Sequence, residues 1–114
     1  MARASQATQQ ITRDGLAPAL TEPTVDGDVV DCGRVVLMVV NGSAGPVTVT
    51  VESTAAQDGL DVEDLAVPVP VGATVLIGPL PGRTFGRPAG APDAGRAYVS
   101  YSAVVGVDRA VLAL

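Results

Sequence analysis

The stretch Arg34-Val-Val-Leu-Met-Val-Val-Asn-Gly-Ser-Ala-Gly-Pro-Val-Thr-Val-Thr-Val-Glu52 joins an apolar run, a turn and an alternating run. The apolar run, Val35 to Val40, is too short to be separated from a buried helix by periodicity alone. Its composition favours a strand, because valine loses rotamer freedom in a helix and packs well on a pleated surface. A strand that is apolar on both faces must be covered on both. We expect the opposite sheet on one side, and the N-terminal segment or another subunit on the other.

The second run, Val47-Thr-Val-Thr-Val51, has valines on one face and threonines on the other. This alternation is typical of a strand with one dry and one solvated face. Between the runs, Asn41-Gly-Ser-Ala-Gly-Pro46 stops any regular structure. We expect the two runs to pair as an antiparallel hairpin, to which the other strands are added.

The rest of the chain predicts further short strands separated by turn signals, and no helix of any length. Pro68 and Pro70 remove amide hydrogens from one edge of their strand, so we expect that strand at a sheet edge. The expected strands are Thr24–Val30, Leu65–Val71, Thr74–Ile77, Arg96–Ala103 and Val107–Leu114. Together with the central pair they predict an all-β fold: an antiparallel β-sandwich of jelly-roll or Ig-like type with seven to eight short strands.

Residues 1–23 are polar and interrupted by prolines, which predicts an extended N-terminal arm ahead of a sandwich domain at residues 24–114. One short strand is expected near Gln10–Arg13. The arm is either a frayed terminus or a contact with a neighbouring subunit. If the arm contacts a neighbouring subunit, Ile11 and Arg13 are the candidate partner-binding residues.

Two connections are expected on the surface. Residues 53–64 are rich in small and acidic residues, with a turn at Asp58-Gly59 and with Leu60 and Val62 as anchors. Residues 83–95 hold glycines, prolines and few apolar residues, which predicts a long loop.

Composition disfavours several function classes. The chain of 114 residues is one domain with no histidine, one cysteine, seven arginines, no lysine and a net charge of −5. Without histidine there is no Ser-His or Cys-His nucleophile pair, and one cysteine allows neither an internal disulfide nor a Cys-based zinc site. An acidic chain repels phosphate backbones, so no nucleic-acid partner is expected. No enzyme activity and no cofactor are expected either.

No secretion signal or membrane-length apolar segment is visible, so we expect a soluble protein made in the cytoplasm, with no membrane partner.

The acidic groups Asp26/Asp28 and Asp58/Asp61/Glu63/Asp64 offer oxygens for calcium or paired carboxylates for glycoside hydrolysis. Asp-Gly is more often plain turn chemistry, and three aromatic residues are too few to build a sugar cleft. No metal site is therefore expected.

Two further candidates are a thiol and a loop. Cys32, beside Gly33-Arg34, is either a reactive thiol or a half-buried inert one, and the lack of histidine favours the second. Arg83-Thr-Phe-Gly-Arg87 places Phe85 between Arg83 and Arg87, a pairing enriched at protein interfaces. These three residues are candidate contacts with an acidic partner surface. The alternative is a loop anchored by one buried phenylalanine.

The chain carries, in order, the motifs Val39-Val-Asn-Gly-Ser43, Pro46-Val-Thr-Val-Thr-Val51, Val71-Gly-Ala-Thr74, Ile77-Gly-Pro-Leu-Pro81 and Tyr98-Val-Ser-Tyr-Ser102. In this order of turns and strands it resembles a family of small virion proteins of tailed phages that infect actinobacteria. The resemblance covers residues 10–114. It lies in turn and strand patterns rather than in catalytic signatures, so no functional residue is carried over.

The resemblance implies a capsid decoration (cement) protein, made in the host cytoplasm and bound to the exterior of the virion. Its expected partners are the major capsid protein and further copies of itself, with a trimer as the expected assembly. One alternative is another virion structural protein, such as a head-to-tail connector or a tail component. Another is a sandwich-type module that binds carbohydrate or cell surfaces, which would need exposed aromatic platforms.

Overall fold

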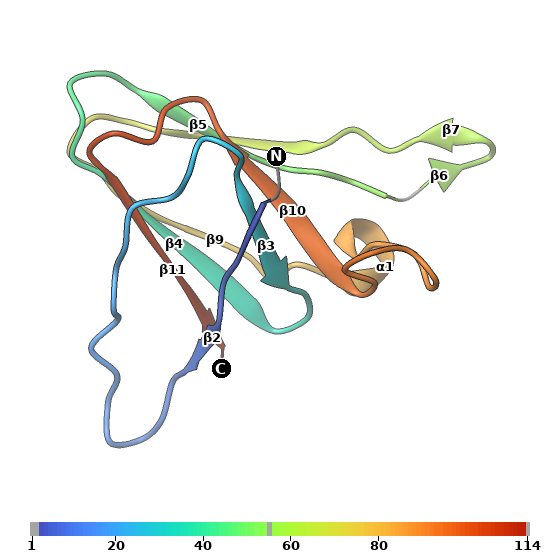
Figure 1. Cartoon of the computed structure of the whole chain (residues 1–114), viewed down its shortest axis with the longest axis horizontal. Coiled ribbons are helices and arrows are strands. Elements are labelled where there is room, and N and C mark those ends of the chain that lie inside the picture. The colour runs from blue at the N-terminus through green and yellow to red at the C-terminus, as the bar shows by residue number, and fades with distance from the viewer. Residues whose placement is uncertain (1–2, 55, 114) are drawn as a thin grey trace.

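Two mixed β-sheets pack against each other in the computed structural model, which describes residues 3–54 and 56–113 (Figure 1). The five-stranded sheet has the order β1 (Ala4–Ser5), β3 (Asp28–Asp31), β10 (Arg96–Tyr101), β5 (Val47–Val51) and β8 (Leu65–Val69). The four-stranded sheet has the order β2 (Thr8–Gln10), β11 (Val107–Ala113), β4 (Val35–Asn41) and β9 (Thr74–Ile77). The all-β sandwich is therefore confirmed. Within the described residues the two sheets hold nine strands, rather than the seven or eight expected.

The expected hairpin between the two central runs is wrong. β4 pairs with β11 and β9, whereas β5 pairs with β10 and β8, so the two strands lie in opposite sheets. The five residues between them, 42–46, form an arch that crosses the sandwich. The Asn41 side chain, which is fully buried, donates to the carbonyl oxygens of Gly45 at 2.9 Å and Val69 at 3.0 Å. The bond to Gly45 holds the arch in shape, and the bond to Val69 ties the end of β4 to β8 of the other sheet.

The core is aliphatic and follows the alternation of the strands. On β4 the buried face is Val35, Leu37, Val39 and Asn41, while the intervening side chains are half-buried. On β5 all three valines are buried and the threonines face outward, as expected. Fully burying one valine or leucine stabilises the fold by about 1.5–3 kcal/mol, so the core depends on many such side chains rather than on a few rings.

The N-terminal segment belongs to the sheets of its own chain. β1 pairs in parallel with β3, and β2 pairs in parallel with β11, so residues 3–10 run from the edge of one sheet to the edge of the other. These two parallel pairs make the sheets mixed rather than purely antiparallel. The expected strand at Gln10–Arg13 instead ends at Gln10. Residues 11–20 then leave the sheet, and Thr21 returns to bridge Arg109 on β11.

The edge position of the proline-containing strand is confirmed. β8 is the last strand of the five-stranded sheet and pairs only with β5, with Pro68 opposite Thr48. The next strand, β9, is the edge of the four-stranded sheet. The turn at residues 70–73 therefore links the two sheets on this side, while the N-terminal segment links them on the other.

Two features lie outside the sheets. β6 (Ala56–Gln57) and β7 (Leu60–Asp61) form a short hairpin around Asp58-Gly59, and Figure 1 shows it projecting from the sandwich. Leu60 is 74% exposed and Val62 39%, so the expectation that they anchor this segment is wrong. The 83–95 loop begins within one helical turn, α1 (Gly82–Phe85), which sequence patterns did not predict.

Candidate functional site

The predicted partner-binding residues do not form one surface patch in the structure. Phe85 is part of the hydrophobic core, as in the alternative of a phenylalanine-anchored loop. Arg87 lies 3.5 Å from the Glu52 carboxylate and its guanidinium stacks 4.4 Å from the Tyr98 ring centre, so both of its contacts are within the chain. Arg83 is exposed on α1. Ile11 and Arg13 are exposed in the 11–20 segment, outside the sheets. The role of these three residues in partner binding stays a prediction.

The other candidates offer little chemistry. Within residues 3–54 and 56–113, no group of three or more His, Cys, Asp or Glu side chains is placed to hold a metal ion. Cys32 is half-buried, and burial, followed by the charge of Asp31, raises the pKa of its thiol. A raised pKa keeps the sulfur protonated and unreactive, which agrees with the interpretation of Cys32 as a half-buried inert thiol.

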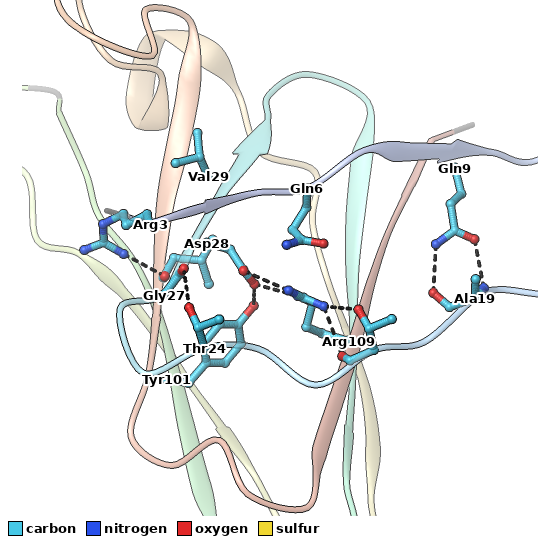
Figure 2. A network of polar contacts seen from close by, with 12 residues as sticks. Arg3, Gln6, Gln9, Ala19, Thr24, Gly27, Asp28, Val29, Tyr101 and Arg109 are labelled. Carbon is cyan, nitrogen blue, oxygen red and sulfur yellow. Dashed lines mark hydrogen bonds and ion pairs between the residues drawn. The ribbon is translucent and has the colours of Figure 1, made fainter. Parts of the chain in front are cut away.

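Sequence reasoning missed a buried polar cluster between the two sheets. Asp28 on β3 and Arg109 on β11 are 0% and 3% exposed. The Asp28 carboxylate accepts from Arg109 Nε at 2.7 Å, from Arg109 Nη2 at 3.0 Å and from the Tyr101 hydroxyl at 2.6 Å. Figure 2 shows both side chains pointing at this carboxylate. The remaining nitrogen, Arg109 Nη1, donates to the carbonyl and hydroxyl oxygens of Thr21.

This cluster is closed and structural. Burial alone would lower the pKa of Arg109, but its hydrogen bonds to Asp28 and the charge of Asp28 outweigh that, and the pKa is raised. For Tyr101, burial and then the charge and hydrogen bond of Asp28 all raise the pKa. The two parallel hydrogen bonds from the Arg109 guanidinium on β11 to the Asp28 carboxylate on β3 join one sheet to the other. No member of the cluster is left free to bind a ligand.

The raised pKa of Tyr101 predicts a loss of stability at alkaline pH. Below the ordinary tyrosine pKa of about 10, Tyr101 is neutral in both the folded and the unfolded state, and its contribution to the free energy of unfolding is fully present. Above that pH the unfolded state loses the proton while the folded state keeps it, so the free energy of unfolding falls by up to about 1.4 kcal/mol per pH unit. Tyr101→Phe is expected to flatten this fall. Urea unfolding of both proteins across the alkaline range checks it, and parallel curves would contradict it.

One end of the sandwich is formed by three turns, which we call the loop end: residues 42–46 after β4, 70–73 after β8 and 102–106 after β10. Figure 1 shows them gathered at the left of the view, away from the β6–β7 hairpin. Backbone hydrogen bonds hold them together, from Gly42 N–H to Gly106 O at 2.8 Å and from Gly72 N–H to Asn41 O at 2.8 Å. The buried Asn41 therefore connects the 42–46 and 70–73 turns, and its neighbour Gly42 connects them to the 102–106 turn.

The loop end carries no charge in an otherwise acidic chain. Residues 40–51, 65–82 and 97–107 contain no Asp, Glu, Lys or Arg. Val71 is 54% exposed and Val105 is 77% exposed, each at the tip of its turn. Nearby acidic residues are Asp26, in the turn before β3, and Asp108, the second residue of β11. An apolar centre depleted of charged residues, with polar residues around it, is the usual anatomy of a protein–protein interface.

Asn41→Ala is expected to loosen the loop end. The substitution leaves the buried Val69 carbonyl without the Asn41 donor and removes the acceptor of the Ser43 amide, a bond of 2.9 Å. We expect a loss of about 2–3 kcal/mol in the free energy of unfolding, measured by urea denaturation. Ser43→Ala, which removes only a hydroxyl, is the matched control, with a loss of about 1 kcal/mol or less. Equal losses in the two variants would contradict the central role of Asn41.

No helix in the described part of the chain is long and apolar enough to cross a membrane. Comparisons of this chain with protein-family models, with curated proteins and with solved structures found no match.

Proposed function

We propose that this protein is a structural component of a phage virion: a decoration protein that binds the outer surface of the major capsid protein shell and stabilises the head. The observation that carries the proposal is the loop end, an uncharged surface with exposed valines on a chain of net charge −5. The surface fits a protein partner, because it is uncharged with exposed valines, while the net charge of −5 repels nucleic acid. The resemblance of the turns and strands to small virion proteins supports the major capsid protein as the partner.

The placement of the polar and aromatic residues supports a non-catalytic role. Asp28 and Arg109 are paired in the core, and the Cys32 thiol is held protonated. The two tyrosines do not form an exposed platform for sugars. Tyr101 points into the core, while the Tyr98 ring has the guanidinium groups of Arg3 and Arg87 at 4.8 Å and 4.4 Å.

Such a protein would act through contacts alone. Many copies bound across junctions between capsid subunits add apolar and hydrogen-bonded contacts, which the internal pressure of packaged DNA must break. The two-sheet core, joined across its middle by the Asp28–Arg109 pair, gives each copy a rigid body through which this load is carried.

Removing the protein from purified particles tests the proposal. Stripped particles are expected to release DNA at lower temperature and lower salt stress than intact ones, and adding the purified protein back is expected to restore both. Particles whose heat and salt resistance is unchanged by removal would overturn the stabilising role. Quantitative mass spectrometry separates the shell from the neck, because hundreds of copies per particle favour the shell and six or twelve favour a connector.

A further inference from the structure

A small apolar pocket lies at the start of β4 and the end of β9. Arg34, Val35, Val36, Gly78 and Pro79 line it, and its volume is about 230 Å³. Apolar cavities of about 150 Å³ already hold a benzene molecule, so this pocket has room for a leucine side chain. Gly78 packs closely against β4, since a Cβ there would lie 2.5 Å from the Val35 carbonyl oxygen.

The rim of this pocket carries a free positive charge. Of the seven arginines, Arg3, Arg87, Arg96 and Arg109 form ion pairs with Glu52, Asp31 or Asp28. The other three arginines are Arg13, Arg34 and Arg83. Their side chains are exposed and, within the described part of the chain, make no hydrogen bond or ion pair. Of these three only Arg34 borders the pocket. The pocket therefore fits an apolar side chain that has a carboxylate beside it.

The β6–β7 hairpin presents such a group. Leu60, the first residue of β7 and two residues after the exposed Asp58, is 74% exposed, and Val62-Glu63-Asp64 further along are exposed as well. The Leu60 side chain is large and apolar, and the rest of its own molecule leaves it exposed to solvent. Because Leu60 is exposed, it does not occupy the pocket of its own molecule.

We infer that the β6–β7 hairpin of one copy docks into the pocket of a second copy, with Leu60 in the apolar pocket and the carboxylates of Asp58 and Glu63 beside Arg34. Two acidic chains repel each other, and this contact places negative groups against an unpaired arginine. Its charge complementarity thereby offsets part of the repulsion. A single well-buried anchor residue commonly dominates such an interface.

The contact is heterologous, since each copy offers a hairpin to one neighbour and a pocket to another. Such contacts close into a ring or continue as a chain. β5 and β9 both start at the loop end and run away from it, so the hairpin and the pocket both lie toward the opposite end. Self-association therefore leaves the loop end free, and the inference does not depend on the proposed function.

Sedimentation velocity of the purified full-length protein tests the contact. The wild type is expected to associate with rising concentration, whereas Leu60→Asp and Arg34→Glu are expected to stay monomeric, with the dissociation constant raised at least about 30-fold. Val105→Asp and Arg13→Glu are matched controls, since both positions are exposed and lie outside the contact. They are expected to associate like the wild type. Thermal unfolding confirms that all four variants fold.

Mixing the two monomeric variants gives the sharpest result. Leu60→Asp retains an intact pocket and Arg34→Glu an intact hairpin, so together they are expected to form a 1:1 dimer and nothing larger. A wild type that stays monomeric at all concentrations, a Leu60→Asp variant that still associates, or a mixture without dimer would each overturn the inference. Failure of shell binding by Val105→Asp alone bears only on the proposed function.

Discussion

Asp28→Asn is expected to lower the free energy of unfolding by about 3–5 kcal/mol, because it leaves the Arg109 guanidinium buried without a counter-charge. Arg109 is 3% exposed and donates two hydrogen bonds to Asp28, at 2.7 Å and 3.0 Å. Asparagine keeps the shape of the side chain but offers one acceptor oxygen and no charge. For a domain of this size the melting temperature is expected to fall by roughly 10–20 °C. Urea denaturation and calorimetry measure both quantities.

Asp31→Asn is the matched control. Asp31 also pairs with an arginine, Arg96 at 3.0 Å, but the two side chains are 46% and 25% exposed. Solvent screens this pair, so a loss of about 1 kcal/mol or less is expected. Replacing both buried partners by apolar residues, as in Asp28→Leu with Arg109→Met, is expected to recover most of the stability lost in Asp28→Asn. Similar losses in Asp28→Asn and Asp31→Asn would show that the buried pair does not hold the sheets together.

Val71→Asp combined with Val105→Asp is expected to reduce binding to stripped particles at least about 100-fold. Both side chains are exposed in the free protein, so the fold tolerates the change. In a shell-bound protein they would be covered by the partner, and a carboxylate that loses water without gaining a counter-charge costs several kcal/mol. Co-sedimentation of purified protein with particles that lack it gives the affinity.

Leu76→Asp is the control for that experiment. Leu76 is 64% exposed, but it lies on the outer face of the β9 edge strand rather than at the loop end. The same change of charge there is expected to leave shell binding within about threefold of the wild type, since charges outside the buried centre affect affinity little. A loop-end variant that binds as tightly as the wild type would exclude this end as the contact surface.

Much of the fold was predictable because the relevant signals are local. The two prolines of the Leu65–Val71 run fix an edge strand through their missing amide hydrogens, and β8 is that edge. The valine–threonine alternation of Val47–Val51 fixes which face is buried, and the three valines are buried.

The pairing of the two central runs was not predictable from local signals. A Gly/Pro segment of six residues permits either a hairpin or an arch between sheets, and the choice depends on bonds from Asn41 to Gly45 and to the distant Val69. The same holds for Asp28 and Arg109, which are 81 residues apart and whose contact follows from the packing of two sheets. Arg109 alternates with the apolar Val107 and Val111 on the core face of β11, and this position was the one available signal for a buried ion pair.

The surface residues were the least predictable. Leu60 and Val62 are apolar and sit beside turn residues, a pattern that fits an anchor as well as an exposed hairpin tip. Phe85, between two arginines, fits an exposed contact as well as the core position that it occupies. In both cases the outcome depends on which part of the sandwich the loop crosses, and neighbouring residues do not encode that.

A cryo-EM map of intact virions tests the central claim most directly. We expect hundreds of copies on the outside of the shell, with residues 42–46, 70–73 and 102–106 of each copy facing the major capsid protein. Density for six or twelve copies at the neck would contradict it. So would a shell contact made by the β6–β7 hairpin, with the loop end facing solvent.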